Sequence, residues 1–336
     1  MKVRPRVTVC VPTFNRWFFL RQALHSLCNQ DLDPNDFVVA ISDNASTDDT
    51  PKVVAQYECQ LQIKYHRNTE NIGFRRNLDM VAGLCDTPYL SFLCDDDLMA
   101  PGHLGRAVSL LDSRAGSVLV ASIAVLQEHP GAIGSYLHGV FLRGDGDTPY
   151  DEPYIWNRAE WLALALVTTP LSSVGSVFRF EAFRRCELCK SYTIWWDRML
   201  LAEMGLYGEV LSLPWVGGYY RIGGHQTNVQ IGSDFAHEVE RVAADIFKIS
   251  ERHAIPVVQF WIDHIVKSTP RERAYYLDLL KKALQPSRYA EIRDNIELQL
   301  GGKLERPGRL ERWGIPSQSA KRLRAIRDAL FSPLGS

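Results

Sequence analysis

The chain of 336 residues lacks a long hydrophobic segment and a strong net charge. No apolar run reaches the ~18 residues that a membrane-spanning helix needs. The apolar run at 7–11 is too short for a signal peptide, so we expect no leader. The formal net charge of -1 gives no general attraction to nucleic acid, and we expect no nucleic-acid partner.

Common cofactor and metal motifs are missing as well. No G-x-G-x-x-G or G-x-x-x-x-G-K-[ST] occurs, which argues against a dinucleotide-binding domain and a P-loop. The seven cysteines are an odd number and are scattered, which favours reduced thiols in a cytoplasmic protein. Cys186 and Cys189 form a C-x-x-C without a second pair for zinc, so we interpret them as structural.

Strand and helix patterns alternate through the first 126 residues. The sequence predicts strands at 7–11, 37–41, 61–66, 88–94 and 118–126, and helices at 17–29, 47–57, 74–84 and 104–111. Residues 127–160 are predicted to be irregular, and 235–300 show helical spacing. This alternation builds a largely parallel sheet, which binds ligands outside the carboxyl ends of its strands.

Polar turns follow the first four predicted strands and should converge on that edge. They are Pro12–Arg16, Asp43–Asp48, Asn71–Gly73 and Asp95–Asp97. The three consecutive carboxylates of the last turn repel one another, and Mg²⁺ or Mn²⁺ with its bound phosphates would compensate them. The alternative is a solvated acidic turn that caps the next helix.

These motifs together resemble an inverting family 2 glycosyltransferase. The matching pieces are VTVCVPTFNR (7–16), SDNASTDDT (42–50), NTENIGFRRNLD (68–79) and YLSFLCDDDLMAPGHL (89–104). The resemblance implies an α/β fold of the GT-A type, with a Rossmann-like, mostly parallel sheet flanked by helices and a C-terminal helical appendage. The catalytic domain would span 1–232, with a nucleotide-sugar half at 1–112 and an acceptor half at 113–232. Residues 233–336 would form a helical region with a basic tail.

Two departures from the family pattern stand out. Arg76 and Asn77 follow Gly73 sooner than in most relatives, and Cys94 stands where many relatives carry the first acid of the acidic motif. The second departure leaves the division of labour among Asp95, Asp96 and Asp97 open.

The resemblance assigns donor-binding roles to the four turns. Asp43 would accept a hydrogen bond from the base of a nucleotide-diphosphate sugar, and Arg16 and Arg76 would bind its ribose or diphosphate. Asp95 would face the ribose, and Asp97 would hold Mn²⁺ or Mg²⁺. The expected donor-binding set is Pro12, Thr13, Asn15, Arg16, Asp43, Asn71, Gly73, Arg76, Asn77, Asp95 and Asp96. The expected metal set is Asp95, Asp97 and His225, with a surface histidine as the alternative for His225.

Asp197 is the expected catalytic residue on the acceptor side. An inverting transfer needs one carboxylate to take the proton of the acceptor hydroxyl. Trp195 and Trp196 precede it and offer apolar rings that could raise its pKa. The alternative is an Asp that caps a helix beside core tryptophans.

The predicted reaction moves one sugar from the nucleotide-diphosphate sugar to a glycan or a lipid-linked saccharide. The chain has no Q-x-x-R-W, so a non-processive enzyme of bacterial polysaccharide biosynthesis, such as O-antigen synthesis, is expected. Residues 303–336 hold eight Lys or Arg against three acids, which suits either a peripheral contact with the inner face of the cell membrane or a solvated helix. A nucleotidyltransferase and a non-catalytic glycan-binding module are the alternatives.

Overall fold

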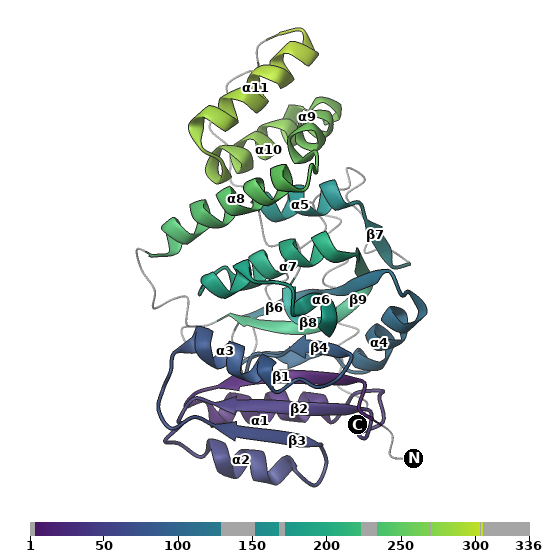
Figure 1. The fold of residues 1–336 in the computed structure, drawn as a ribbon, viewed down its shortest axis with the longest axis vertical. Coiled ribbons are helices and arrows are strands. Elements are labelled where there is room, and N and C mark those ends of the chain that lie inside the picture. The colour runs from purple at the N-terminus through teal and green to yellow at the C-terminus, as the bar shows by residue number, and fades with distance from the viewer. Residues whose placement is uncertain are drawn as a thin grey trace.

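A mixed sheet of nine strands forms the centre of the described part of the protein (Figure 1). The structure is a computed structural model that describes residues 4–128, 152–167, 172–222, 234–268, 270–302 and 304. The strand order is β3-β2-β1-β4-β8-β6-β9-β5, and β7 pairs with β9 beside this path. The predicted α/β fold class is confirmed.

The N-terminal half is the parallel part of the sheet. Its elements are β1 (Val7–Thr13), α1 (Trp17–Leu27), β2 (Phe37–Asp43), α2 (Thr50–Tyr57), β3 (Ile63–Arg67), α3 (Phe74–Gly83) and β4 (Tyr89–Phe92). Every residue of β1 and β2 is buried, as expected for parallel strands covered on both faces. Thr13 lies opposite Asp43 in the register, so the turns after β1 and β2 begin at the same level.

The second half of the sheet mixes parallel and antiparallel pairs. Its elements are β5 (Leu98–Met99), α4 (Leu104–Ser113), β6 (Ser117–Glu128), β7 (Tyr154–Trp156), α5 (Arg158–Val167), β8 (Ser172–Arg179), α6 (Phe180–Phe183), the 3-10 helix η1 (Leu188–Ser191), α7 (Trp196–Tyr207) and β9 (Glu209–Ile222). Strand β8 runs antiparallel to both β4 and β6, whereas β9 runs parallel to β6. Parallel pairing therefore dominates only in β3-β2-β1-β4.

The segment predicted to be irregular contains regular structure. Strand β7 and the start of α5 lie within 127–160, and residues 129–151 are outside the described part. Strand β9 runs through Pro214, which lies where the register against β6 shifts. A register irregularity tolerates proline because no ladder hydrogen bond is lost there.

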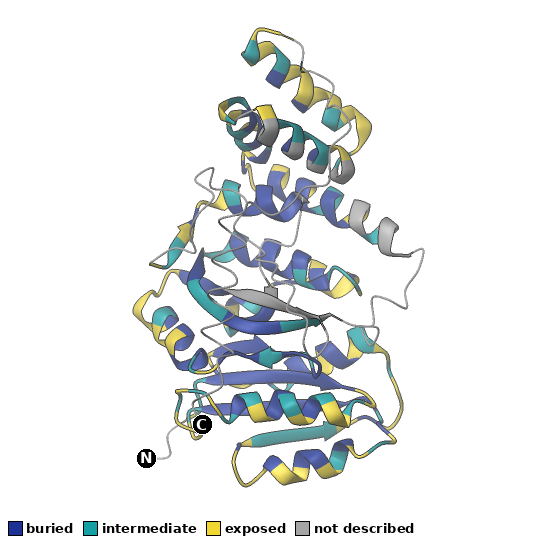
Figure 2. Cartoon of the chain, turned by 180° about the vertical axis from the view of Figure 1, so that it is seen from behind, coloured by how far each residue is buried: buried dark blue, intermediate teal, exposed yellow. Residues whose placement is uncertain are grey.

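The C-terminal helices share a hydrophobic core with the sheet. They are α8 (Asp234–Arg252), α9 (Val257–Lys267), α10 (Pro270–Ala283) and α11 (Pro286–Leu300), which confirms the predicted helical spacing. Trp161 of α5 and Trp261 of α9 are both fully buried in this core, and Nε1 of Trp261 donates to the carbonyl of Ala163 at 3.2 Å. Burial falls off towards α11 (Figure 2). Of the predicted basic tail, only Leu304 is described beyond Gly302.

None of the described helices is long and apolar enough to cross a membrane.

Candidate active site

Asn15 connects the turns that follow β1 and β2. Its φ of 50° is positive, a conformation that Asn adopts more readily than most residues. Its backbone N–H donates to Oγ of Ser46 at 2.9 Å, and its Oδ1 accepts from the backbone N–H of Thr47 at 2.7 Å. Two turns far apart in the sequence are thereby held as one rim of the site.

Asp43 is fully buried at the end of β2 and is already engaged by the chain. Its Oδ1 accepts from the backbone N–H of Ser46 at 2.8 Å, and its Oδ2 accepts from the Tyr65 hydroxyl at 2.5 Å. Burial and then the hydrogen bond to Asp43 raise the pKa of Tyr65. Arg67 adds an ion pair at 3.5 Å. The predicted base-binding carboxylate is thus rigidly oriented by Tyr65, a residue that sequence reasoning missed.

Asn77 belongs to a buried amide network. Its Oδ1 accepts from the Ser42 hydroxyl at 2.7 Å and from Nδ2 of Asn68 at 3.0 Å, and its own Nδ2 donates to the Ser42 carbonyl at 3.0 Å. These bonds hold α3 against the ends of β2 and β3. The predicted donor-binding residue therefore supports the rim from inside.

The turn before α3 is built by Asn71 and Gly73. Oδ1 of Asn71 accepts from Nδ2 of Asn44 at 2.7 Å and from the backbone N–H of Gly73 at 2.9 Å. Gly73 precedes α3 with φ +83°, which other residues rarely adopt. Both predicted residues therefore shape the backbone at this edge.

Arg75 and Arg76 point in different directions from α3. Arg76, the predicted phosphate ligand, is exposed. Arg75 pairs with Asp79, and its guanidinium lies 5.8 Å from the ring centre of Trp196 at the start of α7. The helical rotation between adjacent residues, which a motif alone does not resolve, turns Arg75 rather than Arg76 towards α7.

The acidic triplet follows β4, and its first two carboxylates contact Arg16. Nη1 of Arg16 lies 3.2 Å from Oδ1 of Asp95 and 3.0 Å from Oδ2 of Asp96. Burial and then the charge of Asp96 raise the pKa of Asp95, and the Arg16 charge opposes them. Arg16, predicted to bind ribose or diphosphate, thus compensates part of the triplet itself.

Asp97 is the most deeply buried member of the triplet, 1% exposed. Its Oδ1 accepts from the backbone N–H of Arg221 in β9 at 3.0 Å, and its Oδ2 has no hydrogen-bond partner among the described residues. Burial and then the charge of Asp96 raise the pKa of Asp97 well above its usual range. A buried oxygen without a partner is costly, and a bound cation would compensate it.

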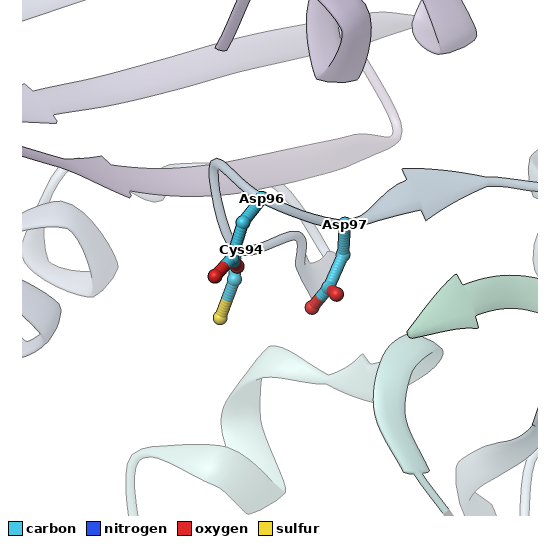
Figure 3. Close-up of side chains that lie close together, drawn as sticks. All are labelled: Cys94, Asp96 and Asp97. Carbon is cyan, nitrogen blue, oxygen red and sulfur yellow. The ribbon is translucent and has the colours of Figure 1, made fainter. Parts of the chain in front are cut away.

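Cys94, Asp96 and Asp97 form a group with ligand atoms within 4.8 Å of one another, and no other such group occurs among the described residues. All three side chains point to the same side of the loop (Figure 3). The residues therefore fit a divalent cation. The grouping differs from the predicted metal set, because Asp96 and Cys94 rather than Asp95 accompany Asp97, although Arg16 contacts both Asp95 and Asp96. The third predicted ligand, His225, lies outside the described residues.

Asp197 lies in the first turn of α7 and is half-buried. Burial raises its pKa to about 6, against the hydrogen bond that it accepts from the backbone N–H of Arg198 at 2.8 Å. Trp195 occupies the N-cap position, so Asp197 is not the N-cap residue of α7. A carboxylate with a pKa near neutrality can accept a proton under physiological conditions.

The two tryptophans before Asp197 differ in their surroundings. Trp196 is buried, and its ring packs edge-on against Phe92 of β4 with the ring centres 5.2 Å apart. Trp195 is half-buried, with the guanidinium of Arg198 5.8 Å from its ring centre. Trp196 is therefore a core residue, and only Trp195 keeps partial access to a ligand.

Tyr220 of β9 connects the triplet with Asp197. Burial raises the pKa of its hydroxyl most, followed by the charges of Asp97, Cys94, Asp197 and Asp96. One half-buried side chain is thus within electrostatic reach of both the candidate metal group and the candidate base. Sequence reasoning missed Tyr220, because nothing in a strand sequence reveals which carboxylates it faces.

The mixed sheet with this edge of acidic and polar turns is a fold of the GT-A type. The family model Glycosyl transferase family 2 matches residues 8–186, more than half of the chain. The chain therefore belongs to glycosyltransferase family 2.

Two curated relatives match about half of the chain or less. Abequosyltransferase RfbV of Salmonella typhimurium is 34% identical over 181 residues, which cover 52% of this chain and 50% of the relative. GalNAc(5)-diNAcBac-PP-undecaprenol beta-1,3-glucosyltransferase of Campylobacter jejuni is 36% identical over 106 residues, 30% of this chain and 32% of the relative. The chain thus spans about half the length of the first relative and about a third of the length of the second.

Two solved structures share the fold over most of the chain. Staphylococcus aureus TarS 1-349 in complex with UDP-GlcNAc has a TM-score of 0.53 at 15% identity, covering 88% of this chain and 92% of that one. The mannosyltransferase PcManGT of Pyrobaculum calidifontis, in complex with GDP-Man and Mn²⁺, has a TM-score of 0.51 at 17% identity, covering 98% and 88%. At these identities the likeness establishes the GT-A fold alone.

Proposed function

We propose that this protein is an inverting, metal-dependent and non-processive glycosyltransferase. It moves a sugar from a nucleotide-diphosphate donor to a glycan or lipid-linked saccharide in bacterial polysaccharide biosynthesis. The observation that carries this proposal is the buried group of Cys94, Asp96 and Asp97 at the edge where the polar turns meet. One oxygen of Asp97 is buried without a hydrogen-bond partner among the described residues, and Asp197 has a pKa of about 6.

Asp97 and Asp197 are assigned separate tasks in the reaction. Asp197 takes the proton of the acceptor hydroxyl while the oxygen forms a bond to the anomeric carbon. The bond from that carbon to the diphosphate breaks on the opposite face, and its electron pair leaves with the nucleoside diphosphate. Mn²⁺ or Mg²⁺, held by Asp97 with Asp96 and Cys94, would neutralise the charge that develops on the leaving group.

The donor is assigned to the rim formed by the turns after β1, β2, β3 and β4, within residues 1–112. Asp43 offers the nucleotide base a fixed hydrogen-bond acceptor. Pro12 and Thr13 are buried beside it at the end of β1. Two fold neighbours were solved with UDP-GlcNAc and GDP-Man, which supports a nucleotide-diphosphate sugar and leaves the base and the sugar open.

The acceptor is assigned to the side of α7, within residues 113–232. The absence of Q-x-x-R-W favours a single transfer per encounter. The names of the relatives, an abequosyltransferase and an undecaprenol-linked glucosyltransferase, favour a surface glycan such as O-antigen. We place the enzyme in the cytoplasm, where reducing conditions keep thiols such as its seven free cysteines reduced. The basic tail from residue 303 onwards would contact the inner face of the membrane.

Turnover of a donor panel tests the proposal. UDP-, GDP-, CDP- and dTDP-sugars are incubated with Mn²⁺ or Mg²⁺, with and without a lipid extract that contains polyprenyl-linked saccharides, and nucleoside diphosphate release is measured. We expect release with one donor class that stops in excess chelator, and an anomeric configuration opposite to that of the donor by NMR. Pyrophosphate release from a nucleoside triphosphate would instead indicate a nucleotidyltransferase, and glycan binding without turnover a binding module.

A further inference from the structure

Helix α8 lies alongside the chain segment that leads into α7. Figure 1 shows the two helices stacked, with their N-terminal ends on the same side of the molecule. Between η1 and α7 the chain runs through residues 192–195 without regular structure. The backbone N–H groups of residues 193–195 precede the first turn of α7 and have no acceptor within the helix, so they need acceptors from elsewhere.

Glu238 of α8 supplies those acceptors. Its Oε1 accepts from the backbone N–H of Thr193 at 3.1 Å, and its Oε2 accepts from Ile194 at 2.9 Å and Trp195 at 3.3 Å. One carboxylate thus holds three consecutive residues that end two positions before Asp197. Hydrogen bonds from N–H groups to a charged acceptor are stronger than neutral ones, so this contact orients the segment firmly.

Two further residues of α8 continue the contact towards η1. Arg241 donates to the carbonyl of Ser191, and its guanidinium lies 4.2 Å from the ring centre of Tyr192. The Tyr192 hydroxyl donates to Oδ2 of Asp245 at 2.7 Å. Positions 238, 241 and 245 recur at helical spacing and so share one face of α8. These polar positions adjoin the apolar stripe of α8 that carries the fully buried Val242 and Ile246.

We propose that Glu238 is a positioning residue for the transfer reaction and acts through Asp197. It fixes the entry of the chain into α7, so the Asp197 carboxylate and the Trp195 ring keep their places on the acceptor side. The C-terminal helical region then contributes, through Glu238, to the positioning of the acceptor side. This inference rests on the proposed role of Asp197 as the base.

Hydrogen exchange tests the contact without reference to activity. In Glu238→Ala the N–H groups of residues 193–195 lose their acceptor, and we expect their exchange to become at least about 10-fold faster. Glu251→Ala is the matched control. It removes a carboxylate from the same helix, where Glu251 is exposed and pairs with Arg288, away from this segment. Unchanged exchange at 193–195 in Glu238→Ala overturns the contact.

Donor hydrolysis tests the functional part, because water then replaces the unknown acceptor and still requires the base. The probe is the sugar nucleotide that turns over in the donor panel, and the readout is nucleoside diphosphate release. We expect Glu238→Ala to lower kcat by about 10-fold, with the donor KM and the Kd of the nucleoside diphosphate with Mn²⁺ within about twofold of wild type. Glu238→Gln keeps one acceptor oxygen and should recover part of kcat, whereas Glu251→Ala should match wild type.

A merely structural role gives a different result. It predicts a lower melting temperature with unchanged kcat, or equal losses in kcat and nucleotide binding, and either outcome overturns the proposal. If no sugar nucleotide turns over in the wild type, the proposed function fails, while the exchange experiment still reports on the Glu238 contact. The two failures are thereby distinguishable.

Discussion

The backbone N–H of Arg221 donates to Oδ1 of Asp97 at 3.0 Å and joins strand β9 to the acidic triplet. The bond leaves Oδ2 of Asp97 buried, without a hydrogen-bond partner in the described part of the chain. Strand β9 also carries Tyr220, so the strand that fixes the carboxylate brings a tyrosine within electrostatic reach of both Asp97 and Asp197. The geometry of the proposed metal site therefore depends on a strand that follows the triplet by more than a hundred residues.

The first prediction concerns Asp97. Asp97→Ala should abolish turnover and weaken nucleoside diphosphate binding in Mn²⁺ by at least about 10-fold in calorimetry, because the cation loses its best-placed oxygen. Asp86→Ala, which removes a carboxylate that is 70% exposed and paired with Lys64, should behave as wild type. Full turnover in Asp97→Ala, or in wild type with excess chelator, would rule out the metal role.

The second prediction concerns Cys94, whose thiol belongs to the group with Asp96 and Asp97. A thiolate favours softer divalent ions than carboxylates do. Titration of the protein with Co²⁺ should therefore give a sulfur-to-cobalt charge-transfer band in the near ultraviolet. The band should vanish in Cys94→Ser and persist in Cys59→Ser, which changes an exposed thiol. A band of equal strength in Cys94→Ser would show that another thiol binds the ion.

The third prediction separates donor binding from stability at Asp43. Asp43→Ala should weaken donor binding by about 1–3 kcal/mol, the cost of losing a hydrogen bond to a charged group. It should also lower the free energy of unfolding, because the Tyr65 hydroxyl and the Ser46 N–H lose their acceptor.

Tyr65→Phe is the control for that stability effect, since it retains the carboxylate and removes only the Tyr65 hydrogen bond. Donor binding should persist in Tyr65→Phe when measured by calorimetry. A loss of acceptor affinity alone in Asp43→Ala would show that the nucleotide pocket lies elsewhere.

The fourth prediction concerns Asp197 and pH. With a pKa of about 6, the carboxylate is deprotonated and competent above that value, so the acidic limb of the rate should have its midpoint near pH 6. Asp197→Asn should lower kcat by about 10²-fold or more and flatten this limb, with donor binding unchanged. Equal turnover in mutant and wild type would exclude the base role. Glu203 is a poor substitute, because its carboxylate already accepts three backbone N–H groups from residues 187–189.

The same pKa shift has a consequence for stability. Burial raises the folded-state pKa above the unfolded value, so the folded protein binds the proton more tightly. The contribution of this group to stability is present at low pH and is lost as the pH rises through about 6. Asp197→Asn removes that loss, so its melting temperature should exceed that of wild type at pH 8 and match it near pH 4. A lower melting temperature of the mutant at pH 8 would contradict the pKa assignment.

The parallel half of the fold could be predicted because its signals are local. The β-branched runs of β1 and β2 are buried on both faces and end in polar turns, so pattern and structure agree. Strand β9 was not among the predicted strands, because its Pro214 and glycines are typical of a loop. Pairing with β6 and β7 overrides that local preference, and a sequence pattern does not contain those partners.

The amino-acid sequence by itself determined the family and the alternation of strands and helices with their polar turns, since these follow from residue type and short spacing. Only the tertiary structure decided that Arg75 faces α7, that Cys94 and Asp96 accompany Asp97, and that Glu238 holds the approach to Asp197. These relationships join residues distant in the chain, and whether two side chains meet depends on strand register and helix rotation. Both are settled by packing of the whole core.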